Sequence, residues 1–206
     1  MMDNPIVFYP TSILLLITLL FSSMEDFKYH RISKKYVLIC LIIVMVYNNV
    51  IGSTVEATIC LILTLGLFST FTFLSKGGFG FGDTLILASL GWYIGNLIHL
   101  EYFFMILGFS MLILGAYFVI INHKQNHKGW KKIFNNIMNV KVEDLKPGMI
   151  LATDYFMKGL TEKEIEQTKQ NHPLGYIIKI KQAYPFIPVI FVSFLCYVIV
   201  YVNYFQ

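Results

Sequence analysis

The stretch VEATICLILTLGLFSTFTFLSKGGFGFGDTLILASLGWYIGNLIHL, residues 55–100, holds two apolar runs separated by a glycine-rich loop that ends in Asp83. Each run is about as long as a helix must be to cross the hydrocarbon core of a bilayer. Lipid offers no water to backbone polar groups, so such runs cross a membrane as helices. The stretch therefore predicts two transmembrane helices joined by a loop that brings a carboxylate to the membrane edge.

Similar apolar runs fill most of the remaining chain. Hydrophobic residues make up 56% of the 206 residues and charged residues only 14%, which is not the composition of a soluble globular domain. We therefore predict an all-α polytopic membrane protein. The six expected transmembrane helices cover residues 5–23, 36–51, 55–74, 84–100, 102–121 and 185–205.

The basic residues predict how these helices are oriented. If the chain crosses six times, all 16 lysine and arginine residues fall on one side of the membrane. Loops rich in lysine and arginine face the cytoplasm, so we expect a plasma-membrane protein with both termini outside. We expect the first run to be retained rather than cleaved as a signal peptide, because no basic residue precedes it.

The segment between the last two runs, residues 122–184, is expected to be a small cytoplasmic α+β insertion. It divides the membrane part into residues 1–121 and 185–206. The first part of the insertion contains HKGWKKIFNNIMNV, residues 127–140, in which apolar residues recur at helical spacing beside lysines. This pattern predicts an amphipathic helix in the headgroup region. Its apolar positions are Trp130, Ile133, Phe134, Ile137 and Met138.

Two local signals indicate structure in the rest of the insertion. The pair Pro147-Gly148 predicts a turn between short extended pieces. Thr161 and Glu164 have the spacing of a capping box, which predicts the start of a short helix.

Two acidic residues, Asp26 and Asp83, are expected at the same membrane face. Asp26 follows the first run and Asp83 opens the fourth, so the predicted topology places both on the cytoplasmic side. Carboxylates at a membrane edge are costly to ionise and are candidates for function. Two neighbouring carboxyl groups tend to hold one proton between them. The ionised member can draw a proton from water while the protonated member donates to a carbonyl oxygen, which is the chemistry of peptide hydrolysis.

Each aspartate also has an ordinary structural interpretation. Asp83, which precedes an apolar helix, would make a good N-cap. Asp26 could pair with Lys28 or Arg31 at the membrane surface. The three cysteines lie in apolar runs without paired spacing, so they predict neither a disulfide nor a metal site.

These motifs resemble those of the type IV prepilin peptidases, membrane aspartic proteases that remove the leader of pilin and archaellin precursors. GFGFGD, with the TLILASLGWYIG that follows, is similar to the family's Gly-x-Gly-Asp motif and the next helix. DFKYHRI resembles the family's other aspartate motif. VEDLKPGMIL, GLTEKEIEQTK and PFIPVIFVSFL resemble the insertion and last span of archaeal members, the prepilin or preflagellin peptidases.

The resemblance implies that Asp26 and Asp83 are the catalytic pair and that Gly80 and Gly82 shape the loop that presents Asp83. It also implies an aspartic endopeptidase that cuts pilin-like or archaellin precursors at the cytoplasmic face of the lipid bilayer. Water would be the nucleophile, so no metal or organic cofactor is expected, and nucleic acid is not expected as a partner. Glycine permits positive φ and a close backbone approach, so an extended substrate could lie against the loop.

Two features depart from the family pattern. Many members have Ile-Pro-Asn after the first aspartate motif, whereas this chain has Ile32-Ser33-Lys34, so the turn into the second helix can differ. The chain also lacks the cysteine-bearing cytoplasmic domain of many bacterial members, and we do not expect it to methylate the trimmed product.

Other functions are compatible with the same residues. Presenilin-like intramembrane proteases share Gly-x-Gly-Asp but pair it with Tyr-Asp, whereas Glu25 precedes Asp26 here. A small proton or cation carrier could bind its ion between two acids at a glycine-broken helix. The absence of an internal repeat and the placement of both acids at one face count against the carrier. A structural assembly protein is a third alternative, but it would not explain the two acidic residues.

Overall fold

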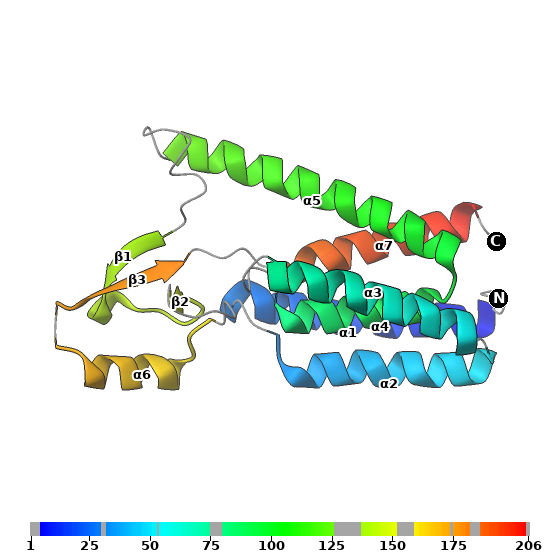
Figure 1. The fold of residues 1–206 in the computed structure, drawn as a ribbon, viewed down its shortest axis with the longest axis horizontal. Helices are drawn as coiled ribbons and strands as arrows, with labels where there is room; N and C mark the ends of the chain where they lie inside the picture. Colours follow the sequence, from blue (N-terminus) through cyan, green and yellow to red (C-terminus); the bar gives the residue numbers. More distant parts are fainter. Residues whose placement is uncertain are drawn as a thin grey trace.

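The computed structural model describes residues 5–29, 32–52, 54–74, 80–125, 137–151, 159–173, 175–181 and 186–204. In this part of the chain the apolar helices form a bundle, and a small sheet with one helix lies beyond one end of it (Figure 1). The first helix begins and the last helix ends at the opposite end of the bundle. The bundle consists of α1 (Pro5–Tyr29), α2 (Lys34–Ile51), α3 (Thr54–Leu74), α4 (Phe81–Ile94), α5 (Leu97–Gln125) and α7 (Ile187–Tyr204).

Five of these helices are long and apolar enough to cross a membrane, namely α1, α2, α3, α5 and α7. The shorter apolar helix α4 has 14 residues. At 1.5 Å per residue it is about 21 Å long, less than the roughly 30 Å of a bilayer core. The prediction of a polytopic, helical membrane protein is confirmed, and the sixth crossing stays a prediction.

The fourth and fifth helices differ from their predicted bounds, because residues 84–100 do not form one helix. The chain leaves α4 at Gly95, which adopts φ 63° and donates its N–H to the carbonyl oxygen of Gly91 over 3.1 Å. The next residue, Asn96, accepts the N–H of Ile98 at 2.9 Å and so caps the start of α5. A glycine C-cap directly followed by an asparagine N-cap separates two helices without an apolar gap.

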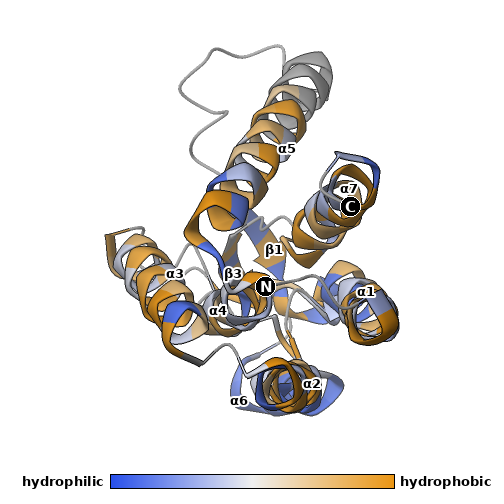
Figure 2. Ribbon diagram, turned by 90° about the vertical axis from the view of Figure 1, so that its right-hand side faces the viewer, coloured by the Kyte–Doolittle hydropathy of each residue, from blue (hydrophilic) through white to orange (hydrophobic). Residues whose placement is uncertain are grey.

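The helix α4 lies in the middle of the bundle (Figure 2). It packs against α2, α3 and α5, and most of its residues are buried. A Cβ at Gly91 would overlap the hydroxyl group of Thr64 on α3, so glycine is what lets α3 and α4 approach this closely.

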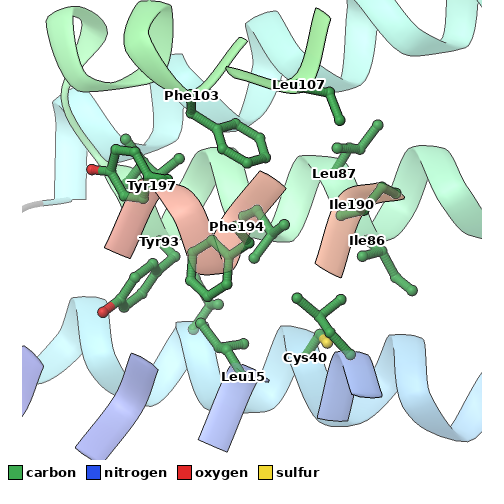
Figure 3. Packing of buried hydrophobic residues seen from close by; sticks show 14 of the residues in the cluster. Leu15, Cys40, Ile86, Leu87, Tyr93, Phe103, Leu107, Ile190, Phe194 and Tyr197 are labelled. Atoms are coloured by element: carbon green, nitrogen blue, oxygen red, sulfur yellow. The ribbon is translucent and has the colours of Figure 1, made fainter. Parts of the chain in front are cut away.

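Aromatic and aliphatic side chains fill the interior of the bundle (Figure 3). Phe194 of α7 meets Tyr93 of α4 edge to face, with ring centroids 5.8 Å apart. The outward faces are apolar as well, which suits contact with lipid rather than water (Figure 2). Along α1, for example, the exposed positions include Ile13, Leu14, Ile17, Leu20 and Phe21.

The insertion is a three-stranded antiparallel sheet with order β1-β3-β2 and one helix. Its elements are β1 (Ile137–Lys141), the 3₁₀ turn η2 (Val142–Asp144), β2 (Ile150–Leu151), α6 (Glu162–Asn171) and β3 (Ile177–Lys181). Its core is formed by Leu145, Leu160, Ile165 and Ile180.

Both local signals in the insertion are confirmed. Gly148 follows Pro147 in a turn and has φ 87°. The Thr161 hydroxyl accepts the N–H of Glu164, and the Glu164 carboxylate accepts the N–H of Thr161 at 2.8 Å, which completes the capping box of α6.

The predicted amphipathic helix is wrong where the structure describes it. Ile137 and Met138 lie on β1, opposite Lys181 and Ile180 of β3. Pairing with β3 satisfies the backbone groups of this segment, and this pairing outweighs the helical spacing of its apolar residues. The other apolar positions of that helix, including Trp130, Ile133 and Phe134, lie outside the described residues. Because α5 continues to Gln125, the predicted boundary at residue 121 falls within a helix; the division of the chain into three parts stays a prediction.

Candidate active site

Asp26 lies three residues before the end of α1, on the face that packs into the bundle, and is 6% exposed. Its Oδ2 atom accepts the backbone N–H of Ile187, the first residue of α7, over 3.0 Å. The first N–H groups of a helix have no partner within the helix and carry partial positive charge. The start of α7 therefore stabilises a negative charge on Asp26.

Asp83 lies in the first turn of α4 and is 8% exposed. The structure assigns the N-cap to Gly80, so Asp83 is at the third helical position and is not itself the N-cap. Its Oδ2 atom accepts the N–H of Gly80 over 3.1 Å, in the manner of the acidic residue of a capping box. Asp83 therefore does cap the helix, but it does so from the third helical position rather than as the N-cap.

The end of α1 and the start of α4 meet at the insertion end of the bundle (Figure 1). There the carboxyl groups of Asp26 and Asp83 are close enough to interact electrostatically. The turn that follows α1 also touches the glycine motif, because a Cβ at Gly82 would lie 3.2 Å from Cδ1 of Ile32. The structure therefore brings the two aspartate motifs together.

Gly80 and Gly82 leave room for the side chains of Asp83 and Ile32 to lie close to the backbone. Gly80 has φ −73° and Gly82 is helical, so neither uses the positive φ that glycine permits. A Cβ at Gly80 would lie 2.7 Å from Oδ2 of Asp83 and would displace that carboxylate. Residues 75–79 of the loop lie outside the described part.

Of the two basic residues considered as partners of Asp26, only Lys28 belongs to the described part of the chain. The Nζ atom of Lys28 lies 4.9 Å from the ring centroid of Tyr29. Arg31 lies outside the described residues. The neighbouring acid Glu25 has a structural role: its Oε2 atom accepts the N–H of Ser33 over 3.2 Å and holds the turn into α2. A proline at position 33 would lack this donor.

The N–H of Ile187 was not predicted as a partner of Asp26. The two bonded residues are 161 positions apart. Nothing in the local sequence of either residue indicates the contact, which depends on how α7 packs beside α1.

Ser22, which lies one turn before Asp26 on the same buried face, was not predicted as a site residue either. Other hydroxyl groups on this face are bonded: Thr18 and Ser23 donate to carbonyl oxygens four residues earlier at 2.8 and 2.7 Å, and Ser12 lies 2.6 Å from the Tyr93 hydroxyl. The Ser22 hydroxyl is buried without a hydrogen-bond partner among the described residues. A buried unpaired hydroxyl costs free energy and commonly marks a place for water or ligand. The four-residue spacing to Asp26 was the signal available in the sequence.

The chemistry available at this end of the bundle is proton transfer. Among the described residues, no group of three or more His, Cys, Asp or Glu side chains could hold a metal ion. What the site offers is a pair of buried carboxyl groups, each with a backbone N–H donor, and a nearby hydroxyl. Such a pair can take a proton from one reactant and give one to another.

Comparison with known proteins gives one match. Residues 13–120 match the model of the type IV leader peptidase family. This range contains both aspartates as well as Gly80 and Gly82. Neither the curated proteins nor the solved structures gave a match.

Proposed function

The chain belongs to the type IV leader peptidase family and is therefore a protease, and from this premise we propose that it is an aspartic endopeptidase in which Asp26 and Asp83 form the catalytic pair. The observation that carries the proposal is the placement of these two buried carboxyl groups at one end of the bundle, where they interact electrostatically. Gly80 and Gly82 are proposed to position Asp83.

The reaction follows from a pair that shares one proton. The ionised carboxylate takes a proton from water as the water oxygen attacks the scissile carbonyl carbon. The protonated carboxyl group donates its proton to the carbonyl oxygen, which gives a neutral tetrahedral intermediate. When the C–N bond breaks, the leaving nitrogen takes the proton of the protonated carboxyl group, and a hydroxyl group of the intermediate gives its proton to the carboxylate. The pair therefore again holds one proton and has its starting charge. The backbone donors of Ile187 and Gly80 hold the two carboxyl groups while protons move.

Ser22 is proposed to complete the polar lining of this site. Its hydroxyl can donate one hydrogen bond and accept others. It lies on the same face of α1 as Asp26 and has no partner among the described residues. A water or a substrate carbonyl group beside Asp26 would satisfy it.

The substrate is proposed to be a pilin-like or archaellin precursor with a short leader before an apolar helix. Family membership implies a pilin-like protein substrate in general. The scissile bond of such a precursor lies where the apolar helix leaves the bilayer. Both aspartates lie at an end of the membrane helices rather than at their middle, which suits a bond in that position. The lysine and arginine distribution supports the cytoplasmic side for this end and the outside for both termini.

The experiment is direct cleavage. The detergent-solubilised chain is incubated with a leader-bearing pilin precursor or a leader-bearing archaellin precursor, and mass spectrometry locates the cut. A cut between the leader and the apolar helix is expected for at least one precursor. Comparison of the two cleavage rates shows which precursor the chain prefers. A chain that cuts neither precursor but carries protons or cations across vesicle membranes would overturn the proposal in favour of a carrier.

A further inference from the structure

The proposed function leaves the insertion without a task. We propose that Gly148 and Gly159 of the insertion are positioning residues, which seat the backbone of the last turn of α1 and thereby hold Asp26 in place. This inference rests on the proposed function for its consequence in catalysis.

The contact is formed by backbone atoms. A Cβ at Gly148 would lie 2.7 Å from the carbonyl oxygen of Lys28 and 3.3 Å from Cα of Tyr29. A Cβ at Gly159 would overlap the carbonyl oxygen of Tyr29 and lie 3.1 Å from Cα of Gly148. Both glycines are buried. Three backbone segments therefore meet at a point where no side chain fits.

This contact of Gly148 and Gly159 with the backbone of Lys28 and Tyr29, here called the seat, is supported by hydrogen bonds within the insertion. The N–H of Gly148 donates to the carbonyl oxygen of Leu160 over 3.0 Å, and the N–H of Leu160 donates to that of Met149 over 2.8 Å. Leu160 also belongs to the small core of the insertion. The two glycine segments are thus fixed to each other and to the sheet.

The seat contacts α1 close to Asp26, so a displacement at the seat would also displace Asp26. Tyr29 is three residues beyond Asp26, or about 4.5 Å along the helix axis. The insertion is also connected to Asp26 through the chain, because β3 ends at Lys181 and α7, which supplies the Ile187 N–H, starts at residue 187. Asp83 is carried by α4, whose main contacts among the described residues are with α2, α3 and α5. A shift of the insertion would therefore move Asp26 relative to Asp83.

The chain provides a matched control in Gly175. It lies in the same insertion and has φ 82°, close to the 87° of Gly148, but it is exposed and a Cβ there would meet nothing within 4 Å. Alanine at position 148 or 175 brings the same backbone strain, and only at 148 does it also enter the seat. Gly159 lies outside the positive-φ region. Gly159→Ala therefore tests the contact without that strain.

The test compares Gly148→Ala, Gly159→Ala and Gly175→Ala in the full chain in detergent, by amide hydrogen exchange and by kcat and KM for precursor cleavage. We expect faster exchange in the last turn of α1 for the first two variants, with exchange in α6 unchanged. Their kcat should fall about tenfold or more with little change in KM, because a small displacement of a catalytic group is costly. Gly175→Ala should match the wild type in the exchange of α1 and in kcat.

Three outcomes would overturn the inference. One is unchanged exchange at the end of α1 in Gly159→Ala. The second is faster exchange there with an unchanged kcat. The third is an equal rise in α6, which would mean that the insertion had merely unfolded. If the wild type cleaves no precursor, the proposed function fails, and the exchange data still decide whether the glycines hold α1.

Discussion

The backbone N–H of Ile187 donates a 3.0 Å hydrogen bond to Oδ2 of Asp26, and so the start of the last helix holds a carboxylate of the first helix. A hydrogen bond to a charged group contributes about 1.5–3 kcal/mol. Because the donor is a backbone group, most substitutions of the Ile187 side chain leave it in place. Proline has no N–H and therefore removes it.

We therefore expect Ile187→Pro to cleave precursor about tenfold or more slowly than Ile187→Ala. Proline fits the first position of a helix and lacks the N–H, whereas alanine keeps it. Both variants lose the buried isoleucine side chain, so their comparison isolates the donor. The measurement is kcat for each purified variant. Equal rates for the two would mean that the N–H of Ile187 does not support Asp26 in catalysis.

Gly80→Ala should lower cleavage about tenfold or more, because the new Cβ would displace the Asp83 carboxylate. Gly66→Ala on α3 is the control: a Cβ there meets nothing within 4 Å, and alanine favours the helix over glycine. Initial rates and thermal unfolding of both variants in detergent would be compared. A fully active Gly80→Ala enzyme would contradict the positioning of Asp83 by this glycine.

Ser22→Ala should lower kcat several-fold without loss of thermal stability, because its buried hydroxyl has no described partner in the resting chain. Ser23→Ala is the neighbouring control. Its hydroxyl is bonded to the carbonyl oxygen of Leu19, and its loss should leave kcat near that of the wild type. If the two variants are equally active, Ser22 has no part in the site.

Local signals predicted local structure well. Thr161 and Glu164 indicated their capping box from spacing alone, since both partners lie within one helical turn. The apolar runs indicated the membrane helices because lipid leaves the backbone few alternatives. The end of the fourth helix was not predicted correctly. In the sequence Gly95 and Asn96 lie within one apolar run, and only the structure shows that they are the caps of two separate helices.

Features that depend on distant contacts were not predicted. Ile137 and Met138 fit a helical pattern, and only the pairing with β3 makes them a strand. The sequence placed Asp26 and Asp83 at one face by counting spans. The hydrogen bond from the Ile187 N–H to Asp26 and the packing of Gly148 on the backbone of Lys28 could not be predicted from local patterns.

The central claim is that Asp26 and Asp83 act together in hydrolysis, and the most direct measurement is the rate of leader cleavage by Asp26→Asn and Asp83→Asn. Asparagine keeps the size of the side chain and removes the carboxyl group that would carry protons. Each single variant is expected to lose activity by a factor of 100 or more, roughly the contribution of general acid–base catalysis, and the double variant should be little worse than either. The folded state would be checked by thermal unfolding in detergent. Cleavage at the wild-type rate and position by either single variant would contradict the account.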